Sequence, residues 1–114
     1  MTGPSPPEWE TRVELRLAEL AAGGKTITYA ELARQTAIPG PHRIHKLTVF
    51  LETLMERDAL LGAPLRSAVV VSRTHGMPGR GFFDKLHELG LASPAEDPRQ
   101  LHQRLLGALN PPRP

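Results

Sequence analysis

The chain has 114 residues, of which 39% are hydrophobic and 23% charged, with a formal net charge of +2, and these values predict one globular domain with a single modest core. Because the sequence contains no cysteine, it excludes disulfides, thiolate metal sites and thiol nucleophiles, and it is compatible with a reducing compartment. No apolar stretch approaches the roughly 18 residues of a membrane span, and the first residues do not read as a secretory leader. We therefore expect a cytoplasmic protein with no membrane segment.

The first predicted helix begins at the sequence SPPE, residues 5–8, which has the form of a capping box with proline in the first turn. The helix runs to about Ala22, and the glycines at positions 23 and 24 end it. Its apolar stripe, spaced at three and four residues, consists of Trp9, Val13, Leu17, Leu20 and Ala21. We expect flexible ends at 1–5 and 111–114 around one domain at 6–110.

A short helix followed by a longer one comes next, which is the helix-turn-helix plan. Thr28 and Glu31 form a second capping box at the start of TYAELARQT. The segment AIPGPH interrupts it, and Pro41 is expected in the first turn of a third helix over 42–61. The expected inward stripe of that helix is Ile44, Leu47, Leu51, Leu54 and Met55, with Phe50 beside it. Glu56 and Asp58, near its end, are expected at the surface.

The second half of the chain predicts a small β element and two further helices. Residues 65–72, LRSAVVVS, read as a strand with 68–71 buried on both faces. The glycine-rich sequence GMPGRGFF, residues 76–83, is predicted to form a wing, with Pro78 at its tip and Phe82 and Phe83 pinning it to the core. FFDKLHELG predicts a short helix, and SPAE at 93–96 is expected to cap a last helix. The predicted fold class is therefore mainly α with a small β element, a winged-helix-like, helix-turn-helix single domain.

The distribution of charge favours a nucleic-acid partner. Between Asp58 and Asp84 the sequence has no acidic residue, so a local positive surface is expected there. In a helix-turn-helix domain the start of the second helix meets the DNA. The basic side chains at that start are His42, Arg43, His45 and Lys46. Arginine is the best suited of them to a guanine edge.

The sequence GGKTITYAELARQTAIPGPHRIHKL resembles the DNA-binding domain of the O6-alkylguanine-DNA alkyltransferases and their alkyltransferase-like relatives. In that family a Gly-Lys-x-x-Thr-Tyr segment leads into the first helix of a helix-turn-helix, and an arginine lies near the start of the second. The resemblance, over roughly residues 23–83, implies that Tyr29 and Arg43 correspond to the family residues that rotate a damaged nucleotide out of the duplex and fill its place.

The chain departs from the family after the predicted strand. The family has a Pro-Cys-His-Arg-Val segment there, with tryptophan or alanine replacing the cysteine in the non-catalytic relatives, whereas this chain passes through SRTH into GMPGRGFF. Transfer of an alkyl group to cysteine is excluded because the chain has none. Other catalysis is not expected, and no metal or other cofactor is predicted.

We therefore predict a non-catalytic DNA-binding protein. The expected DNA-contacting residues are Tyr29, His42, Arg43, Lys46, Arg73, His75 and Arg80. The alternative is a protein-interaction or regulatory adaptor module that binds no nucleic acid. In that case a protein partner or a second copy would bind the last helix through a leucine stripe at 101, 105 and 109.

Overall fold

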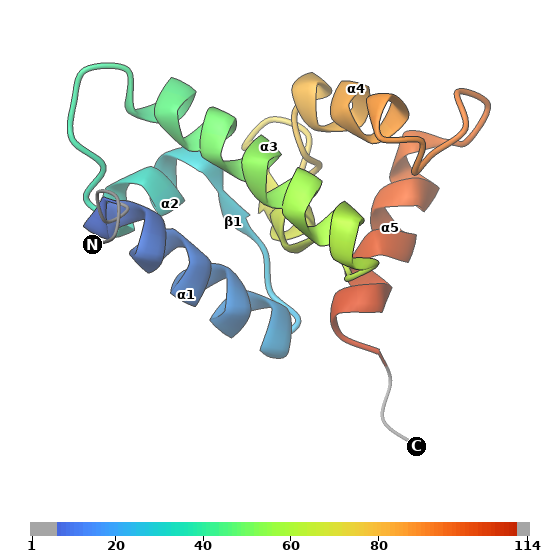
Figure 1. The fold of residues 1–114 in the computed structure, drawn as a ribbon, viewed down its shortest axis with the longest axis horizontal. Helices are drawn as coiled ribbons and strands as arrows, with labels where there is room; N and C mark the ends of the chain where they lie inside the picture. Colours follow the sequence, from blue (N-terminus) through green and yellow to red (C-terminus); the bar gives the residue numbers. More distant parts are fainter. Residues whose placement is uncertain (1–6, 112–114) are drawn as a thin grey trace, which may run out of the picture.

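The computed structural model describes residues 7–111, so the predicted flexible ends lie outside this range apart from Pro111. The described residues form five α-helices, one 3-10 helix and a two-stranded sheet, which confirms a mainly α fold with a small β element. In chain order the elements are α1 (Glu8–Ala22), β1 (Ile27–Thr28), α2 (Tyr29–Gln35), α3 (Arg43–Leu61), η1 (Arg66–Val69), β2 (Val70–Val71), α4 (Arg80–Glu88) and α5 (Pro98–Leu109). The long helix α3 crosses the molecule, with α1 and α2 toward its first half and α4 and α5 toward its second (Figure 1). Within 7–111, no helix combines the length and the apolar character needed to cross a bilayer.

Helix α1 begins later than the predicted capping box. Its N-cap is Pro7 and no side chain caps it, while Ser5 lies outside the described residues. The predicted end is confirmed, because Gly24 adopts a positive φ of 64° and the amide of Lys25 donates to the carbonyl of Leu20 at 2.9 Å. This is the glycine-terminated geometry that satisfies the last carbonyls of a helix.

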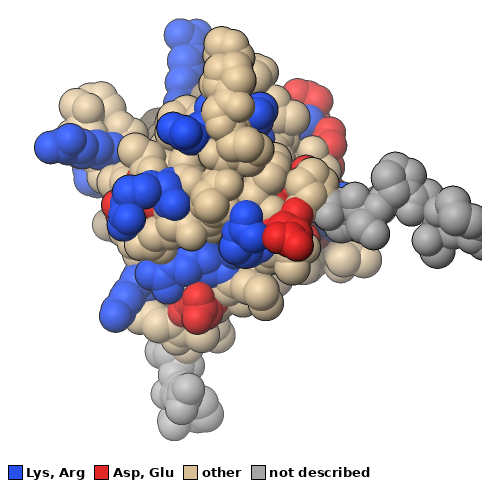
Figure 2. All heavy atoms as spheres, turned by 90° about the vertical axis from the view of Figure 1, so that its left-hand side faces the viewer, with Lys and Arg blue, Asp and Glu red and all other residues tan. Residues whose placement is uncertain are grey.

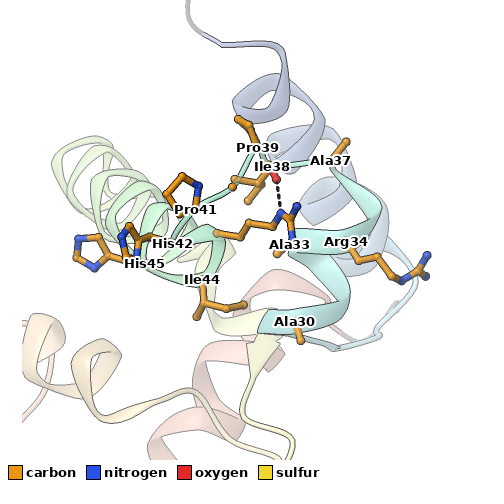
Figure 3. Close-up of a pocket in the computed structure, with 12 residues that line it drawn as sticks. Ala30, Ala33, Arg34, Ala37, Ile38, Pro39, Pro41, His42, Ile44 and His45 are labelled. Atoms are coloured by element: carbon orange, nitrogen blue, oxygen red, sulfur yellow. Dashed lines mark hydrogen bonds between the residues drawn. The ribbon is translucent and has the colours of Figure 1, made fainter.

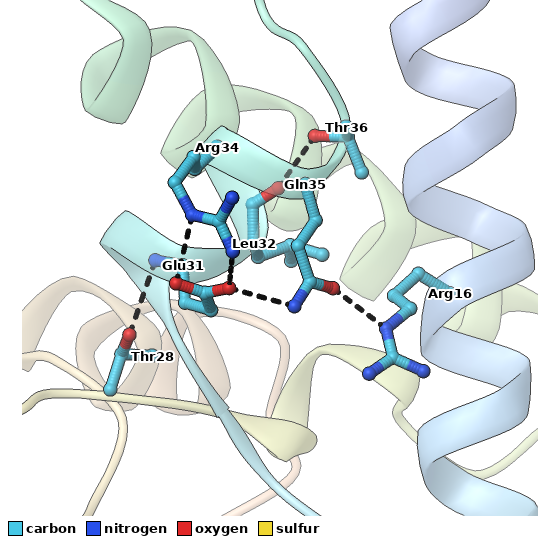
Figure 4. Close-up of polar contacts among 7 residues, drawn as sticks. All are labelled: Arg16, Thr28, Glu31, Leu32, Arg34, Gln35 and Thr36. Atoms are coloured by element: carbon cyan, nitrogen blue, oxygen red, sulfur yellow. Dashed lines mark hydrogen bonds and ion pairs between the residues drawn. The ribbon is translucent and has the colours of Figure 1, made fainter.

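Helix α2 has the predicted cap and is tied to α1 by a chain of polar contacts (Figure 4). The hydroxyl of Thr28 accepts from the amide of Glu31 at 3.2 Å. The Glu31 carboxylate accepts from Arg34 and from the Gln35 amide group instead of returning to Thr28. These bonds from Arg34 and Gln35 lower the pKa of Glu31. Gln35 in turn accepts from Arg16 of α1 at 2.9 Å, so α2 is fixed in orientation against α1.

Helix α3 confirms most of its predicted stripe but not its first turn. It begins at Arg43, and its N-cap His42 has a left-handed backbone with φ 62°, so Pro41 precedes the helix and is not in its first turn. The buried residues of the stripe are Leu47, Phe50, Leu51, Leu54 and Met55. Ile44 is 45% exposed, in contrast to the prediction, because it faces open hollows and not a neighbouring helix.

Asp58 is 3% exposed, so its predicted place at the surface is wrong. Its carboxylate accepts from the amide and the side chain of Arg66 at 3.0 and 3.1 Å. Arg66 also donates to Glu14 of α1 at 3.0 Å. A buried carboxylate is tolerated where such bonds and an opposite charge compensate its lost hydration. The network joins α1, α3 and η1.

The predicted strand at 65–72 is largely replaced by the 3-10 helix η1, and strand geometry is limited to Val70 and Val71. These pair in parallel with Ile27 and Thr28. The pairing is short because β1 has a glycine turn before it and Thr28, which already caps α2, at its end. The predicted burial of residues 68–71 is confirmed.

The last two helices begin at other residues than predicted. Helix α4 starts at Arg80, two residues before Phe82. Helix α5 is capped by Asp97, whose carboxylate accepts from the amide of Gln100 at 3.0 Å. The SPAE sequence forms a turn ahead of it, in which the Ser93 hydroxyl accepts from the amide of Ala95.

Two clusters of buried side chains form the core. One joins α1, β1, α2, the first part of α3 and β2, and the other joins Met55 of α3 with α4 and α5. Leu101 and Leu105 are buried in the second cluster, and Leu109 is partly buried against both. Leu101 and Leu105 are therefore covered by their own chain, and Leu109 is covered in part.

Candidate nucleic-acid interface

The glycine-rich segment is packed against the body of the protein and is not a projecting hairpin. The amide of Ser72 donates to the carbonyl of Met77 at 2.6 Å, and the amide of Gly76 donates to the carbonyl of Ser72 at 2.9 Å, which closes the loop between β2 and α4. Pro78 is buried, so its predicted position at an exposed tip is wrong. Phe82 is buried and Phe83 packs against the same cluster, as predicted.

Tyr29 connects this segment to the start of α2. Its hydroxyl oxygen accepts from the amide of Gly79, the N-cap of α4, at 2.9 Å. Burial, and to a smaller extent the charge of Glu52, raise the pKa of Tyr29. The hydroxyl therefore stays protonated and keeps a hydrogen to donate while its oxygen holds Gly79. Tyr29 thus fixes the first residue of α4, Arg80, relative to α2.

A largely apolar groove lies beside Tyr29, with a volume of about 520 Å³. The start of α2, the first two turns of α3, the loop after β2 and the start of α4 form its walls. Ala30, Ile44 and Phe82 supply apolar lining, and Arg73 is the one charged residue among the described residues that line it. The structure therefore brings together two predicted contact residues, Tyr29 and Arg73.

A second, larger hollow of about 1120 Å³ opens between α2 and the start of α3 (Figure 3). The segment 37–41 forms one wall, and His42, Arg43 and His45 lie on the side of α3. Ala30 and Ile44 line both this hollow and the groove beside Tyr29. The hollow and the groove are therefore adjacent parts of one surface, which we call the α2–α3 face.

Two of the predicted contact residues form hydrogen bonds with backbone carbonyls of the protein itself. Arg43 donates through Nε to the carbonyl of Ile38 at 2.9 Å, which Figure 3 shows as the dashed line. Lys46 donates to the carbonyl of Pro39 at 2.8 Å. Arg12 of α1 donates to the carbonyl of Thr36, also at 2.8 Å. These three cations satisfy carbonyls of the segment between α2 and α3, so Arg43 and Lys46 have a structural role whatever else they contact.

The remaining predicted contact residues, Arg73, His75 and Arg80, are exposed but do not all lie on the α2–α3 face. Arg73 and His75 are exposed in the loop after β2. The Arg80 side chain is 94% exposed, and its Nε lies 3.9 Å from Asp84 Oδ2, a separation at which an exposed pair contributes little. His75 and Arg80 do not line the groove or the hollow.

The interval without acidic residues in sequence is not free of acid in space. Glu52 of α3 lies close to the start of α4, and a side chain added at Gly81 would place its Cβ 3.5 Å from Glu52 Oε2. This carboxylate reduces the positive potential on the α4 side of the groove. The face viewed from the side of α2 and the start of α3 shows Lys and Arg side chains spread across it and fewer acidic ones (Figure 2). Basic side chains are thus prominent on this side of the molecule.

Sequence reasoning missed two residues of this face. Arg34 lines the larger hollow and pairs with Glu31, and Ile44 was assigned to the core by its helical spacing. Spacing alone gives no signal for Ile44, because exposure at a helix end depends on what packs there. Within 7–111, no three His, Asp or Glu side chains gather in a way that could hold a metal ion.

Comparisons of this chain with protein-family models, with curated proteins and with solved structures gave no match. The resemblance to the alkyltransferase DNA-binding domain therefore stays a prediction that depends on the residues from Gly24 to Tyr29 and on the order of the elements.

Proposed function

We propose that this protein binds duplex DNA through the α2–α3 face without performing chemistry on it. The observation that carries the proposal is that basic side chains from separate segments border one continuous surface. His42, Arg43 and His45 lie at the hollow, and Arg73 lies at the groove that shares Ala30 and Ile44 with it. A short helix followed by a helix with basic residues at its start is the arrangement through which helix-turn-helix proteins enter a groove of DNA.

The exposed cations give the electrostatic part of the proposed binding. Arg73 and Arg80 are exposed, and the structure gives Arg80 no ion pair closer than 3.9 Å. Such side chains can contact phosphates at little cost in existing bonds. Arg43 and Lys46 would have to release, or share, the carbonyls of Ile38 and Pro39. We therefore assign phosphate contacts to Arg73 and to Arg80, which lies at the edge of the face between two residues that line the groove. Arg43 and Lys46 are assigned a positioning role.

The proposal is tested by fluorescence anisotropy with a duplex of about two helical turns, ~20 base pairs. We expect the affinity to fall steeply with salt, and Arg73→Ala to reduce the slope of log K against log salt by about 0.9, the value for one phosphate contact. Arg99→Ala is the matched control, because Arg99 is exposed on the first turn of α5, away from the α2–α3 face (Figure 1). It should leave the slope unchanged.

Arg43→Ala is a poor first test, because it would also disturb the segment that the Arg43 side chain holds. Arg80→Ala serves better as the second variant. Absence of binding to duplex DNA at low salt, or equal losses for Arg73→Ala and Arg99→Ala, would refute the proposal.

A further inference from the structure

We infer that Ile44 determines specificity on the α2–α3 face by contacting the methyl group of a pyrimidine base in the major groove. This inference rests on the proposed function. The side chain of Ile44 is apolar, whereas the surface around it is basic. Ile44 is the second residue of α3 and is 45% exposed.

Two polar groups near Ile44 already form hydrogen bonds within the protein. The Arg43 guanidinium donates to the carbonyl of Ile38. Thr48, one turn further along α3, donates its hydroxyl hydrogen to the carbonyl of Ile44 at 2.9 Å. The Nε of Arg43 and the hydroxyl of Thr48 thus donate to the backbone. Ile44 is therefore the apolar side chain that this part of α3 offers to a base, beside the exposed His42 and His45.

The surroundings of Ile44 suit a methyl group. Ile44 lies at the border of the hollow and the groove, next to Ala30 at the start of α2, and Figure 3 shows its side chain directed toward Ala30. Ala30, Ile44 and Thr48 all line the groove beside Tyr29. In the major groove, thymine presents a 5-methyl group to such apolar surfaces, whereas unmethylated cytosine does not. A methyl group that enters this surface would exchange water contact for aliphatic contact.

The basic side chains around Ile44 favour DNA over an apolar peptide as the partner that binds this surface. Arg34, Arg43 and Arg73 border the same surface, and a phosphate backbone is the partner that several cations around a small apolar centre would attract. The N-terminal residues of the second helix are also the ones that meet base edges in helix-turn-helix complexes.

The experiment compares two duplexes of about 20 base pairs, an alternating A·T sequence and the same sequence with deoxyuridine in place of thymidine. Uridine lacks only the methyl group. We expect the wild-type protein to bind the thymidine duplex about fourfold more tightly, the size expected for burial of one methyl group. A second pair, an alternating G·C duplex with and without 5-methylcytosine, should show a preference of the same sign for the methylated duplex.

Two variants separate Ile44 from the rest of the helix. Ile44→Ala should abolish the preference for methylated bases in both pairs of duplexes. Val49→Ala is the matched control, since Val49 is 51% exposed on the same helix but lines a different groove, beside Trp9 and Phe50. It should keep the preference. Thermal melting checks that both variants fold.

The outcomes separate failure of the Ile44 assignment from failure of the proposed function. Binding of all duplexes without a methyl preference, or a preference that survives in Ile44→Ala, overturns the assignment of Ile44 and leaves the proposed function intact. If the wild-type protein binds none of the duplexes at low salt, the proposed function is overturned and this inference with it.

Discussion

Replacement of Asp58 by alanine is expected to destabilise the fold more than any change to the exposed charges of α3. Asp58 is 3% exposed, and its two carboxylate oxygens accept from the amide and the guanidinium of Arg66. The side-chain hydrogen bond to Asp58 raises the pKa of Arg66. Without that bond the arginine still keeps its charge, because a guanidinium is not deprotonated in proteins near neutral pH. The variant therefore leaves a partly buried cation and an unsatisfied backbone amide.

Breaking a buried ion pair on one side costs about 3–5 kcal/mol. Here the cost should lie at or below the lower end, since the Arg66 side chain is 27% exposed and keeps Glu14 as a partner at 3.0 Å. We expect the free energy of unfolding to fall by about 2–3 kcal/mol. At roughly 4 °C per kcal/mol for a chain of this size, the melting temperature should fall by about 8–12 °C.

The assay is thermal and urea unfolding followed by circular dichroism. Asp58→Asn should lose less stability than Asp58→Ala, because the amide keeps an oxygen that can accept from the backbone of Arg66. Arg57→Ala is the matched control, as Arg57 is the exposed neighbour of Asp58 on the same helix. If Asp58→Ala lowers the free energy of unfolding by less than about 0.5 kcal/mol, the range of ordinary surface substitutions, the reasoning is refuted.

Tyr29→Phe should lower the free energy of unfolding by about 1 kcal/mol, the net contribution of a hydrogen bond. It should also speed hydrogen exchange at Gly79, because the Gly79 amide loses its acceptor. Unchanged exchange at Gly79 would contradict the contact. His102→Phe should destabilise the fold, because the imidazole Nε2 lies 2.8 Å from the Ala68 carbonyl in a buried position, and equal melting temperatures for variant and wild type would show that this bond contributes nothing. The bonds from Arg34 and Gln35 lower the pKa of Glu31, so their stabilisation is present above the pKa of an unfolded-chain glutamate, about 4.3, and is lost as the pH falls through the lower folded-state pKa. Melting curves of wild type and Glu31→Gln between neutral and acid pH should therefore converge at low pH, and curves that stay parallel would argue against a role for the Glu31 charge.

Sequence reasoning succeeded where the structure is determined locally. The Thr28 cap, the glycines after α1 and the inward stripe of α3 depend on residues within one or two helical turns. The strand at 65–72 was overestimated, because the valines favour extended backbone but their partner β1 supplies two residues. Strand length here is a property of the pair and not of either sequence alone.

Candidate contact residues can be proposed from the sequence one by one, but their arrangement cannot. The contact of Tyr29 with Gly79 joins residues 50 positions apart, and that of Arg66 with Glu14 spans 52. No local pattern contains such information. The same holds for Arg43, which was predicted as a DNA contact from its place at a helix start, whereas its bond to Ile38 depends on the path of the segment before the helix.

The division of the core into two clusters has a consequence for how the protein unfolds. Helix α3 supplies Leu54 to one cluster and Met55 to the other, and Leu106 and Leu109 of α5 pack against both. Loss of either cluster would expose side chains that the other needs as neighbours, so we expect the two halves to melt in one cooperative transition. A substitution that destabilises the buried face of α5 would then reduce the proposed DNA occupancy of the α2–α3 face by lowering the fraction of folded molecules, without altering the intrinsic affinity of those that remain folded.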